Sequence, residues 1–249
     1  MFLPAMAMSA EQLGIVLMHG KGSSPSKGVG SLADALQGKD YLVENLEMPW
    51  SGRRDYDVDV KAAEQEIEAA IASLRGKGAR KIFVAGHSQG GGFALHFGGH
   101  HTVDGIIAIA PGGDVGHQTF RQQLEETMAE ARRLVAEGKG QEKARLADYE
   151  GSKGKYPVVT TPAAYITWFD PEGAMSANRA VSEMNKSTPV LYIAPTRDYP
   201  GLRKAKDRLF GALPSNALTK LYEPNADHTG APSASTDEIA RWTQEVAAR

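Results

Sequence analysis

One pentapeptide carries the residue types of a covalent nucleophile site. Residues 86–90 read Gly-His-Ser-Gln-Gly and fit the pattern G-x-S-x-G. They follow the apolar run KIFVA (81–85) and precede a segment typical of a helix, which is the strand–turn–helix context that this pattern requires. In such a turn the hydroxyl stands clear at the edge of a sheet, near free helix N–H groups. We therefore predict Ser88 to be a nucleophile; the alternative is a tight glycine turn with an incidental serine.

A serine hydroxyl needs a base, and the base needs an orienting acid. His228 lies in a loop after the last expected strand, from which its ring can reach across the strand ends. Asp198 follows the preceding expected strand, and the chain order Ser, Asp, His agrees with an acid role. Asp198 could instead cap a turn. Asp114 is the reserve candidate for the acid, and Asp227 is expected to be an ordinary loop residue.

The remaining histidines give weaker signals. His96 and His100 lie four residues apart on one face of the helix expected after Ser88, so a metal pair is conceivable. The H-E-x-x-H context of a zinc helix is missing, however, and packing or solvation is the default interpretation. His87 is expected to lean away from the nucleophile, and His117 has no identifiable partner. We predict no metal and no cofactor.

Composition narrows the classes of function. The 249 residues carry a formal net charge of −2, which does not favour binding to nucleic acid or to anionic membrane surfaces. There is no cysteine, so disulfides, thiolate metal sites and a cysteine nucleophile are excluded. No apolar run reaches the length of a membrane-spanning helix. We expect a small-molecule substrate.

Short apolar runs alternate with longer segments of helical periodicity, which predicts an α/β fold with a mostly parallel central sheet and helices on both faces. Strands are expected at 14–18, 41–48, 81–85, 105–110, 189–194 and 217–222, and helices at 28–37, 60–74, 89–99, 202–210 and 236–247. The rhythm is interrupted at 113–188, where an amphipathic helix near 120–135 precedes a polar stretch and an aromatic segment. We interpret 113–188 as a helical cap insertion in a core made of 13–112 and 189–249.

The first twelve residues form a separate N-terminal segment. Ala5-Met6-Ala7 has the A-x-A form of a signal cleavage site, so residues 1–7 could be the remnant of an export signal. The other interpretation is a short frayed terminus. A cytoplasmic and an exported location both stay open.

With these motifs in place, the chain resembles the α/β-hydrolase fold superfamily over residues 13–112 and 189–248. The insertion corresponds in position to the cap that this superfamily commonly carries after its sixth strand. The resemblance implies Ser88 as nucleophile, His228 as base and Asp198 as acid. His19-Gly20-Lys21-Gly22 resembles the family's H-G-x loop, which implies that the backbone N–H groups of Lys21 and Gln89 hold an oxyanion. A phosphate-binding loop is the alternative for residues 20–24, but its pattern is not satisfied.

We therefore predict a serine hydrolase that cleaves carboxylic esters through an acyl-enzyme. A peptidase, amidase or thioesterase would use the same three residues, and a non-catalytic binding protein on this fold is a third class. Five aromatic residues are candidates for the substrate pocket, although each could equally belong to the core: Trp50, Tyr165, Trp168, Phe169 and Tyr199.

Overall fold

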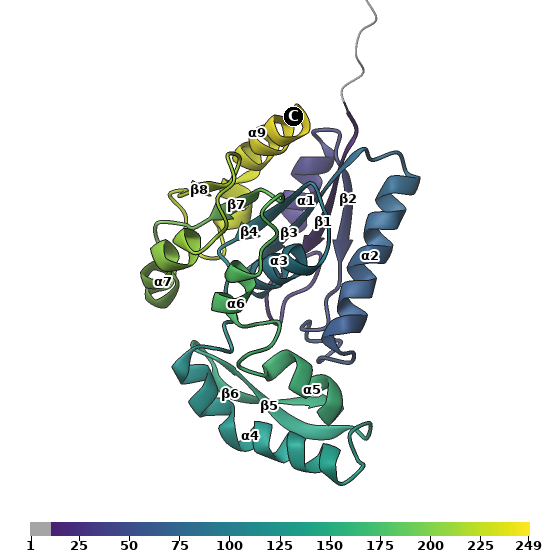
Figure 1. Cartoon of the computed structure of the whole chain (residues 1–249), viewed down its shortest axis with the longest axis vertical. Coiled ribbons are helices and arrows are strands. Elements are labelled where there is room, and N and C mark those ends of the chain that lie inside the picture. The colour runs from purple at the N-terminus through teal and green to yellow at the C-terminus, as the bar shows by residue number, and fades with distance from the viewer. Residues whose placement is uncertain (1–10) are drawn as a thin grey trace, which may run out of the picture.

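The computed structural model describes residues 11–249, and a central parallel sheet dominates it (Figure 1). Within these residues the sheet has six strands in the order β2-β1-β3-β4-β7-β8. Their bounds are β1 Leu13–Met18, β2 Leu42–Leu46, β3 Lys81–His87, β4 Gly105–Ile109, β7 Val190–Ile193 and β8 Lys220–Tyr222. Three of the four inner strands, β1, β4 and β7, are buried along their whole length, because parallel strands are covered on both faces.

Helices cover both faces of the sheet, which confirms the predicted fold class. The side chains of α1 (Gly30–Gln37) and α9 (Thr236–Ala247) form one apolar cluster with one face, and the short helix α8 (Ala231–Ala234) joins it. The helices α2 (Val60–Gly76) and α3 (Gln89–His100) belong to a second cluster on the opposite face, together with α6 (Ala177–Ser182) and α7 (Pro200–Gly211). Since all six strands are parallel, the loops that follow them meet at one edge.

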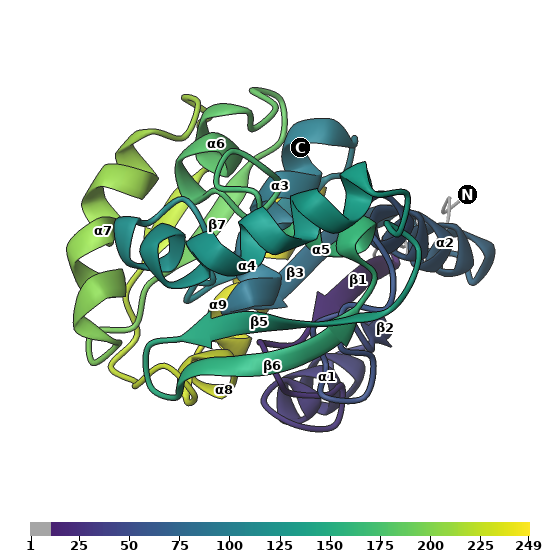
Figure 2. The same ribbon diagram turned by 90° about the horizontal axis from the view of Figure 1, so that it is seen from below.

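Residues 113–188 contain more than the helices that the sequence predicts. After α4 (Gln118–Ala136) the chain forms an antiparallel hairpin, β5 (Ala144–Glu150) with β6 (Gly154–Thr160), and then α5 (Pro162–Phe169). In Figure 1 these elements lie below the sheet, and the view from below shows α4 and the hairpin in front of it (Figure 2). The hairpin was not predicted, because only Leu146, Asp148, Val158 and Thr160 are buried along it and the alternation of apolar and polar residues is weak.

Among residues 11–249, no helix is both long and apolar enough to cross a bilayer. The proposed signal remnant at residues 1–7 lies outside the described residues.

The packing of α9 on the sheet gives a test of the fold. Trp242 is buried, its ring meets Phe83 edge-on at 5.8 Å, and its indole N–H donates to the Leu218 carbonyl at 2.7 Å. We expect Trp242→Ala to lower the free energy of unfolding by about 3–5 kcal/mol. Gln244→Ala, two residues away on the exposed face, should change it by less than about 0.5 kcal/mol. Urea unfolding measures both, and equal effects would contradict this packing.

Candidate active site

Ser88 occupies a strained turn between β3 and α3. Its backbone has φ 54° and ψ −117°, a positive φ that side-chain-bearing residues rarely adopt. The turn closes only because glycines flank it. A Cβ on Gly86 would lie 2.1 Å from the carbonyl oxygen of Gly90, and one on Gly90 would lie 2.7 Å from that of Met18. The Ser88 N–H donates to the carbonyl of Ile109 at 2.9 Å, which ties the turn to β4. Ser88 is therefore displayed at the carboxyl edge of the sheet.

Two backbone N–H groups are available near this turn. Gln89 begins α3, and the first N–H groups of a helix have no partner within it. Lys21 lies in the loop after β1, where a Cβ on its neighbour Gly20 would lie 3.2 Å from Ser88 Cβ. Within residues 11–249 neither N–H donates a hydrogen bond. The two amides predicted as oxyanion donors therefore remain free to bind a ligand.

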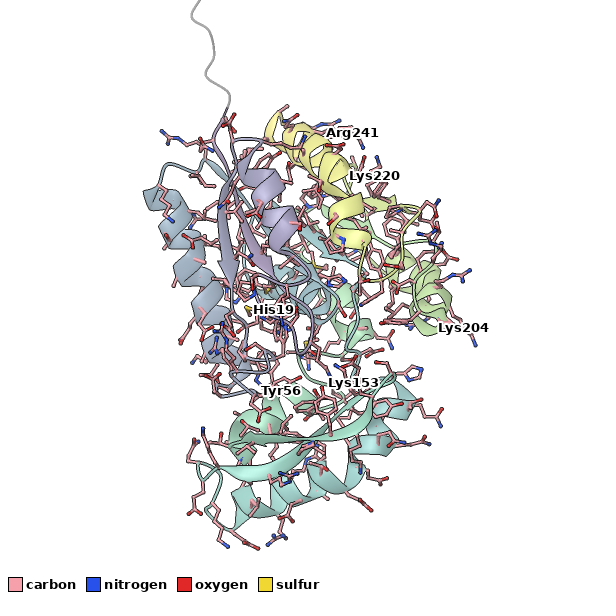
Figure 3. The ribbon with its side chains drawn as sticks, turned by 180° about the vertical axis from the view of Figure 1, so that it is seen from behind. His19, Tyr56, Lys153, Lys204, Lys220 and Arg241 are labelled. Carbon is pink, nitrogen blue, oxygen red and sulfur yellow. The ribbon has the colours of Figure 1, made fainter. Side chains whose placement is uncertain are left out.

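The loop that carries Lys21 is fixed by His19, which is fully buried (Figure 3). The Met48 N–H donates to His19 Nε2 at 3.1 Å, so Nδ1 carries the proton and donates to the Gly20 carbonyl at 2.8 Å. Burial lowers the pKa of His19 and so favours this neutral ring. Trp50 completes the attachment, because its indole N–H donates to the His19 carbonyl at 2.8 Å and its own carbonyl accepts from the Gly22 N–H at 2.9 Å.

His228 and Asp198 are hydrogen-bonded, as the sequence predicts for a base and its acid. His228 Nδ1 lies 2.7 Å from Asp198 Oδ1, which also accepts from the Tyr199 N–H at 2.7 Å. A carboxylate can only accept, so His228 Nδ1 carries the proton and Nε2 keeps its lone pair. The reserve residue Asp114 is engaged elsewhere, since its Oδ1 accepts from the N–H groups of Gly116 and Ala177 at 3.0 Å.

The loops after β7 and β8 bring these two side chains together. The Thr196 N–H donates to the Pro224 carbonyl and the Arg197 N–H to the Ala226 carbonyl, both at 3.0 Å, so the strand pairing continues briefly beyond the sheet. Asp227 accepts from the Gly230 N–H at 2.7 Å and is a loop-capping residue, as expected.

Ser88 and His228 line the same cavity, although no hydrogen bond joins their side chains in the described residues. His87 lies against the base: its ring centre is 4.8 Å from that of His228, and its Nε2 donates to the His228 carbonyl at 2.9 Å. Tyr199 covers the same ring, with its centre 4.6 Å away. The imidazole of His228 therefore packs against the rings of both His87 and Tyr199.

The shared cavity has a volume of about 710 Å³ and a largely apolar wall. Core loops contribute Gly20, Lys21 and Gln89, whereas residues 113–188 contribute Phe120, Tyr149 and Met175. Other apolar lining comes from Leu95, Ala174, Val181, Leu202 and Leu209. The size suits a small or medium organic ligand.

Of the five aromatic candidates for this pocket, only Tyr199 lines it, and this residue is also 51% exposed. Trp50, Tyr165, Trp168 and Phe169 are instead buried in the apolar core between α3 and the insertion. Trp168 packs against both Trp50 and Phe93, at 5.7 Å and 5.2 Å between ring centres. The structure thus favours the core alternative for these four residues.

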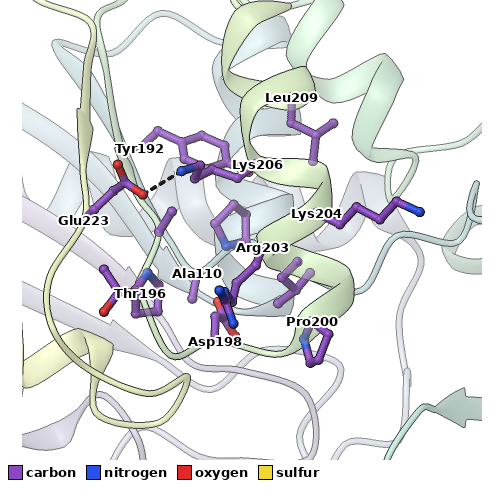
Figure 4. Close-up of a pocket in the computed structure, with 14 residues that line it drawn as sticks. Ala110, Tyr192, Thr196, Asp198, Pro200, Arg203, Lys204, Lys206, Leu209 and Glu223 are labelled. Atoms are coloured by element: carbon purple, nitrogen blue, oxygen red, sulfur yellow. Dashed lines mark hydrogen bonds and ion pairs between the residues drawn. The ribbon is translucent and has the colours of Figure 1, made fainter.

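A second cavity, of about 540 Å³, is lined by Asp198 and by residues of α7 (Figure 4). Its wall is more polar and includes Arg203, Lys204 and Lys206, the last paired with Glu223 at 2.6 Å. Four residues line both cavities: Pro111, Tyr192, Leu202 and Leu209. Ser88 and His228 do not line this second cavity.

The histidines of α3 meet a glutamate of α2. His96 Nε2 lies 3.0 Å from Glu64 Oε1, and one ligand atom from each of Glu64, His96 and His100 falls within 4.8 Å of the others. The Nδ1 of His100 donates to the His96 carbonyl at 2.8 Å. The contact between His96 and Glu64 joins the two helices, and the absence of a metal there stays a prediction.

A buried polar cluster between the core and the insertion was not predicted. Its centre is Asp148 of β5, which is fully buried and contacts Lys21, Tyr56 and Tyr156. Figure 3 shows Tyr56 beside the insertion. No motif in the polar stretch around Asp148 marks it; the only signal is that Leu146 and Asp148 share one face of a strand.

The tight turn at Ser88 predicts that Gly86 tolerates no side chain. Gly86→Ala should lower the free energy of unfolding by more than about 2 kcal/mol or prevent folding, because its methyl group would overlap the Gly90 backbone. Gly211→Ala is the control, because a Cβ at this end of α7 would have no atom within 4 Å apart from its chain neighbours and its own helix backbone. This change should leave the free energy of unfolding unaltered or raise it by up to about 1 kcal/mol. Soluble yield and urea unfolding compare the two, and a stable Gly86→Ala variant would refute this turn.

The buried ring of His87 should make the stability of the protein depend on pH. Burial, together with the neighbouring His228 ring, lowers the pKa of His87 from 6.5 to about 4. The unfolded chain therefore binds this proton below pH 6.5, whereas the folded protein resists it until about pH 4. The contribution of His87 to the free energy of unfolding is fully present above pH 6.5. It falls by up to about 1.4 kcal/mol per pH unit as the pH drops towards 4. His87→Gln, which keeps a donor for the His228 carbonyl, should flatten that slope in urea unfolding; an unchanged slope would contradict the burial of a neutral ring.

Comparison with known proteins agrees with this architecture. The sequence profile described as "Alpha/beta hydrolase family" matches residues 15–242. No curated protein matches the chain in sequence. Solved structures with a similar fold include the monoacylglycerol lipase of Paleococcus ferrophilus, with 19% identity and a TM-score of 0.65 over 94% of each chain.

Two further solved structures share the fold. The ferulic-acid-bound Est1E of Butyrivibrio proteoclasticus has 14% identity and a TM-score of 0.63, over 98% of this chain and 93% of that one. The alpha/beta hydrolase GrgF from Penicillium has 13% identity and a TM-score of 0.69, over 96% and 90%. At these identities the likeness shows the fold alone, but the profile spans most of the sequence, and the protein therefore belongs to the alpha/beta hydrolase family.

Proposed function

We propose that the protein is a serine hydrolase that cleaves carboxylic esters, with Ser88 as nucleophile, His228 as base and Asp198 as the acid that orients the base. The observation that carries this proposal is the 2.7 Å contact between His228 Nδ1 and Asp198 Oδ1, beside a cavity whose wall also holds Ser88. It leaves the Nε2 lone pair of His228 available as a proton acceptor.

The reaction begins with attack of Ser88 Oγ on the ester carbonyl carbon while His228 Nε2 accepts the hydroxyl proton. We assign stabilisation of the tetrahedral oxyanion to the backbone N–H groups of Lys21 and Gln89, where loss of one donor typically costs about 10²–10³ in rate. The imidazolium then protonates the leaving alcohol, which leaves an acyl-enzyme. Water repeats the cycle: His228 takes its proton, the acid is released and Ser88 regains its hydrogen.

The side chains of Ser88 and His228 must come within hydrogen-bond reach for the first step. In proteins without a bound substrate such catalytic contacts are often long and tighten only in the complex. The hydroxyl can turn about a single torsion, whereas Asp198, Tyr199 and His87 hold the imidazole. We therefore expect the serine to move and the ring to stay.

An ester is the preferred substrate class for two reasons: the cavity wall is largely apolar, and the proteins of similar fold include a monoacylglycerol lipase and an enzyme with bound ferulic acid. We propose that residues 113–188 act as a cap, since Phe120, Tyr149 and Met175 close the cavity opposite the core loops. A panel of p-nitrophenyl esters, thioesters and aminoacyl amides should show the highest kcat/KM for esters.

Replacement of Ser88 tests the nucleophile. Ser88→Ala and Ser88→Gly should each lower ester kcat by at least about 10³-fold and abolish labelling by a fluorophosphonate, because both remove Oγ. Glycine adopts a positive φ without strain, so Ser88→Gly should also be more stable than Ser88→Ala by about 1 kcal/mol.

Mass spectrometry of the labelled wild-type protein locates the modified residue. Turnover that survives in both variants, or a label on another side chain, would refute the assignment of Ser88.

A further inference from the structure

The carboxylate of Asp148 receives four hydrogen bonds in a site closed to water. Its Oδ1 accepts from Lys21 Nζ at 2.7 Å and from the Tyr149 N–H at 2.6 Å. Its Oδ2 accepts from the hydroxyls of Tyr56 at 2.8 Å and Tyr156 at 2.9 Å. A buried charge is costly unless it is fully paired and hydrogen-bonded, and this one is. Such a carboxylate holds its partners in fixed positions.

Two of those partners lead to the residues whose amides flank the Ser88 turn. Lys21 binds Asp148 through its side chain and lines the cavity, and within residues 11–249 its backbone N–H donates no hydrogen bond. Tyr56 accepts a hydrogen bond from Gln89 Nε2 at 3.3 Å; among residues 11–249 this is the only hydrogen bond of the Gln89 side chain, and its buried Oε1 has no partner there. One carboxylate from the insertion is therefore linked to both residues through their side chains.

The chemistry of the cluster fits a rigid link. Burial and the charge of Asp148 raise the pKa of Tyr56 and of Tyr156, so both phenols stay protonated and donate to the carboxylate. The side chain of Lys21 is only 10% exposed, its Nζ also donates to the Tyr149 carbonyl at 3.2 Å, and it lies 5.0 Å over the ring of Phe120. Lys21 is thus enclosed by the insertion.

We propose that Asp148 is a positioning residue for the oxyanion site: through Lys21 on one side, and through Tyr56 and Gln89 on the other, it sets the two backbone N–H groups that receive the developing negative charge. This inference rests on the proposed function and extends it, because it makes a residue of the insertion necessary for the chemical step. A displacement of about 1 Å at such a site can cost about 10²-fold in rate.

Two single variants test the link. Asp148→Asn keeps the shape but removes the charge that holds Lys21, and Tyr56→Phe removes the hydroxyl that holds Gln89. Both should lower kcat, Asp148→Asn by about 10- to 100-fold, and leave KM nearly unchanged, because the lost stabilisation exists only in the transition state. The matched control is Tyr165→Phe, which removes an insertion hydrogen bond to the Ala147 carbonyl, 2.6 Å long, without touching Lys21 or Gln89. It should keep wild-type kcat even if its melting temperature falls.

A double variant separates positioning from mere stability. Lys21→Met or Asp148→Asn alone leaves an unpaired polar group in the buried cluster, whereas Lys21→Met/Asp148→Asn leaves no unpaired charge. We expect the unfolding midpoint of the double variant to recover towards that of the wild type while kcat stays low. Recovery of kcat together with stability would show that the cluster only holds the fold together, and would overturn the proposal.

Wild-type kcat in either Asp148→Asn or Tyr56→Phe would also overturn it. If Asp148→Asn fails to fold, Tyr56→Phe decides the question alone. Fluorophosphonate labelling of the wild-type protein at Ser88 tells the two possible failures apart. If Ser88 is not labelled, the proposed function itself is wrong. If Ser88 is labelled but the variants keep the wild-type kcat, only the proposed role of Asp148 is wrong.

Discussion

The hydrogen bond between His228 and Asp198 is the interaction on which the proposed chemistry depends. Because Asp198 accepts the proton on Nδ1, the lone pair of the imidazole is confined to Nε2, the nitrogen that a base must use. The carboxylate is itself held by the Tyr199 N–H, and the loops that carry both side chains are joined by backbone hydrogen bonds beyond the ends of β7 and β8. The orientation of the His228 ring is therefore a property of the sheet edge and not of one flexible loop.

The same sheet edge stabilises a conformation that the serine would not adopt alone. A positive φ at a residue with a side chain costs about 1–3 kcal/mol, and the contacts of β3, β4 and α3 offset this cost. The small residues Gly86 and Gly90 allow the close approach of strand and helix that the turn needs. Strain at Ser88 and the free N–H groups beside it thus arise from one local geometry.

Much of this arrangement could be predicted from the sequence. Buried parallel strands are short apolar runs, and the pattern around Ser88 has a single structural context, so the sheet and the serine turn follow from local residues. The pairing of His228 with Asp198 follows from their places after successive strands. The hairpin β5–β6 and its Asp148 could not be found in this way, because a carboxylate satisfied by residues 92 and 127 positions away leaves no local pattern. The core positions of Trp50 and Trp168 likewise depend on contacts made only in three dimensions.

The insertion lines the cavity and its buried carboxylate reaches Lys21, so in the proposed mechanism it links substrate enclosure to the oxyanion site. The most direct test of the whole account is a crystal structure of the protein after reaction with a phosphonate ester. We expect a covalent bond to Ser88 Oγ, His228 Nε2 within hydrogen-bond distance of an oxygen of the adduct, and the phosphoryl oxygen about 2.7–3.1 Å from the backbone nitrogens of both Lys21 and Gln89. A phosphoryl oxygen directed away from those two amides, or an adduct on another residue, would contradict it.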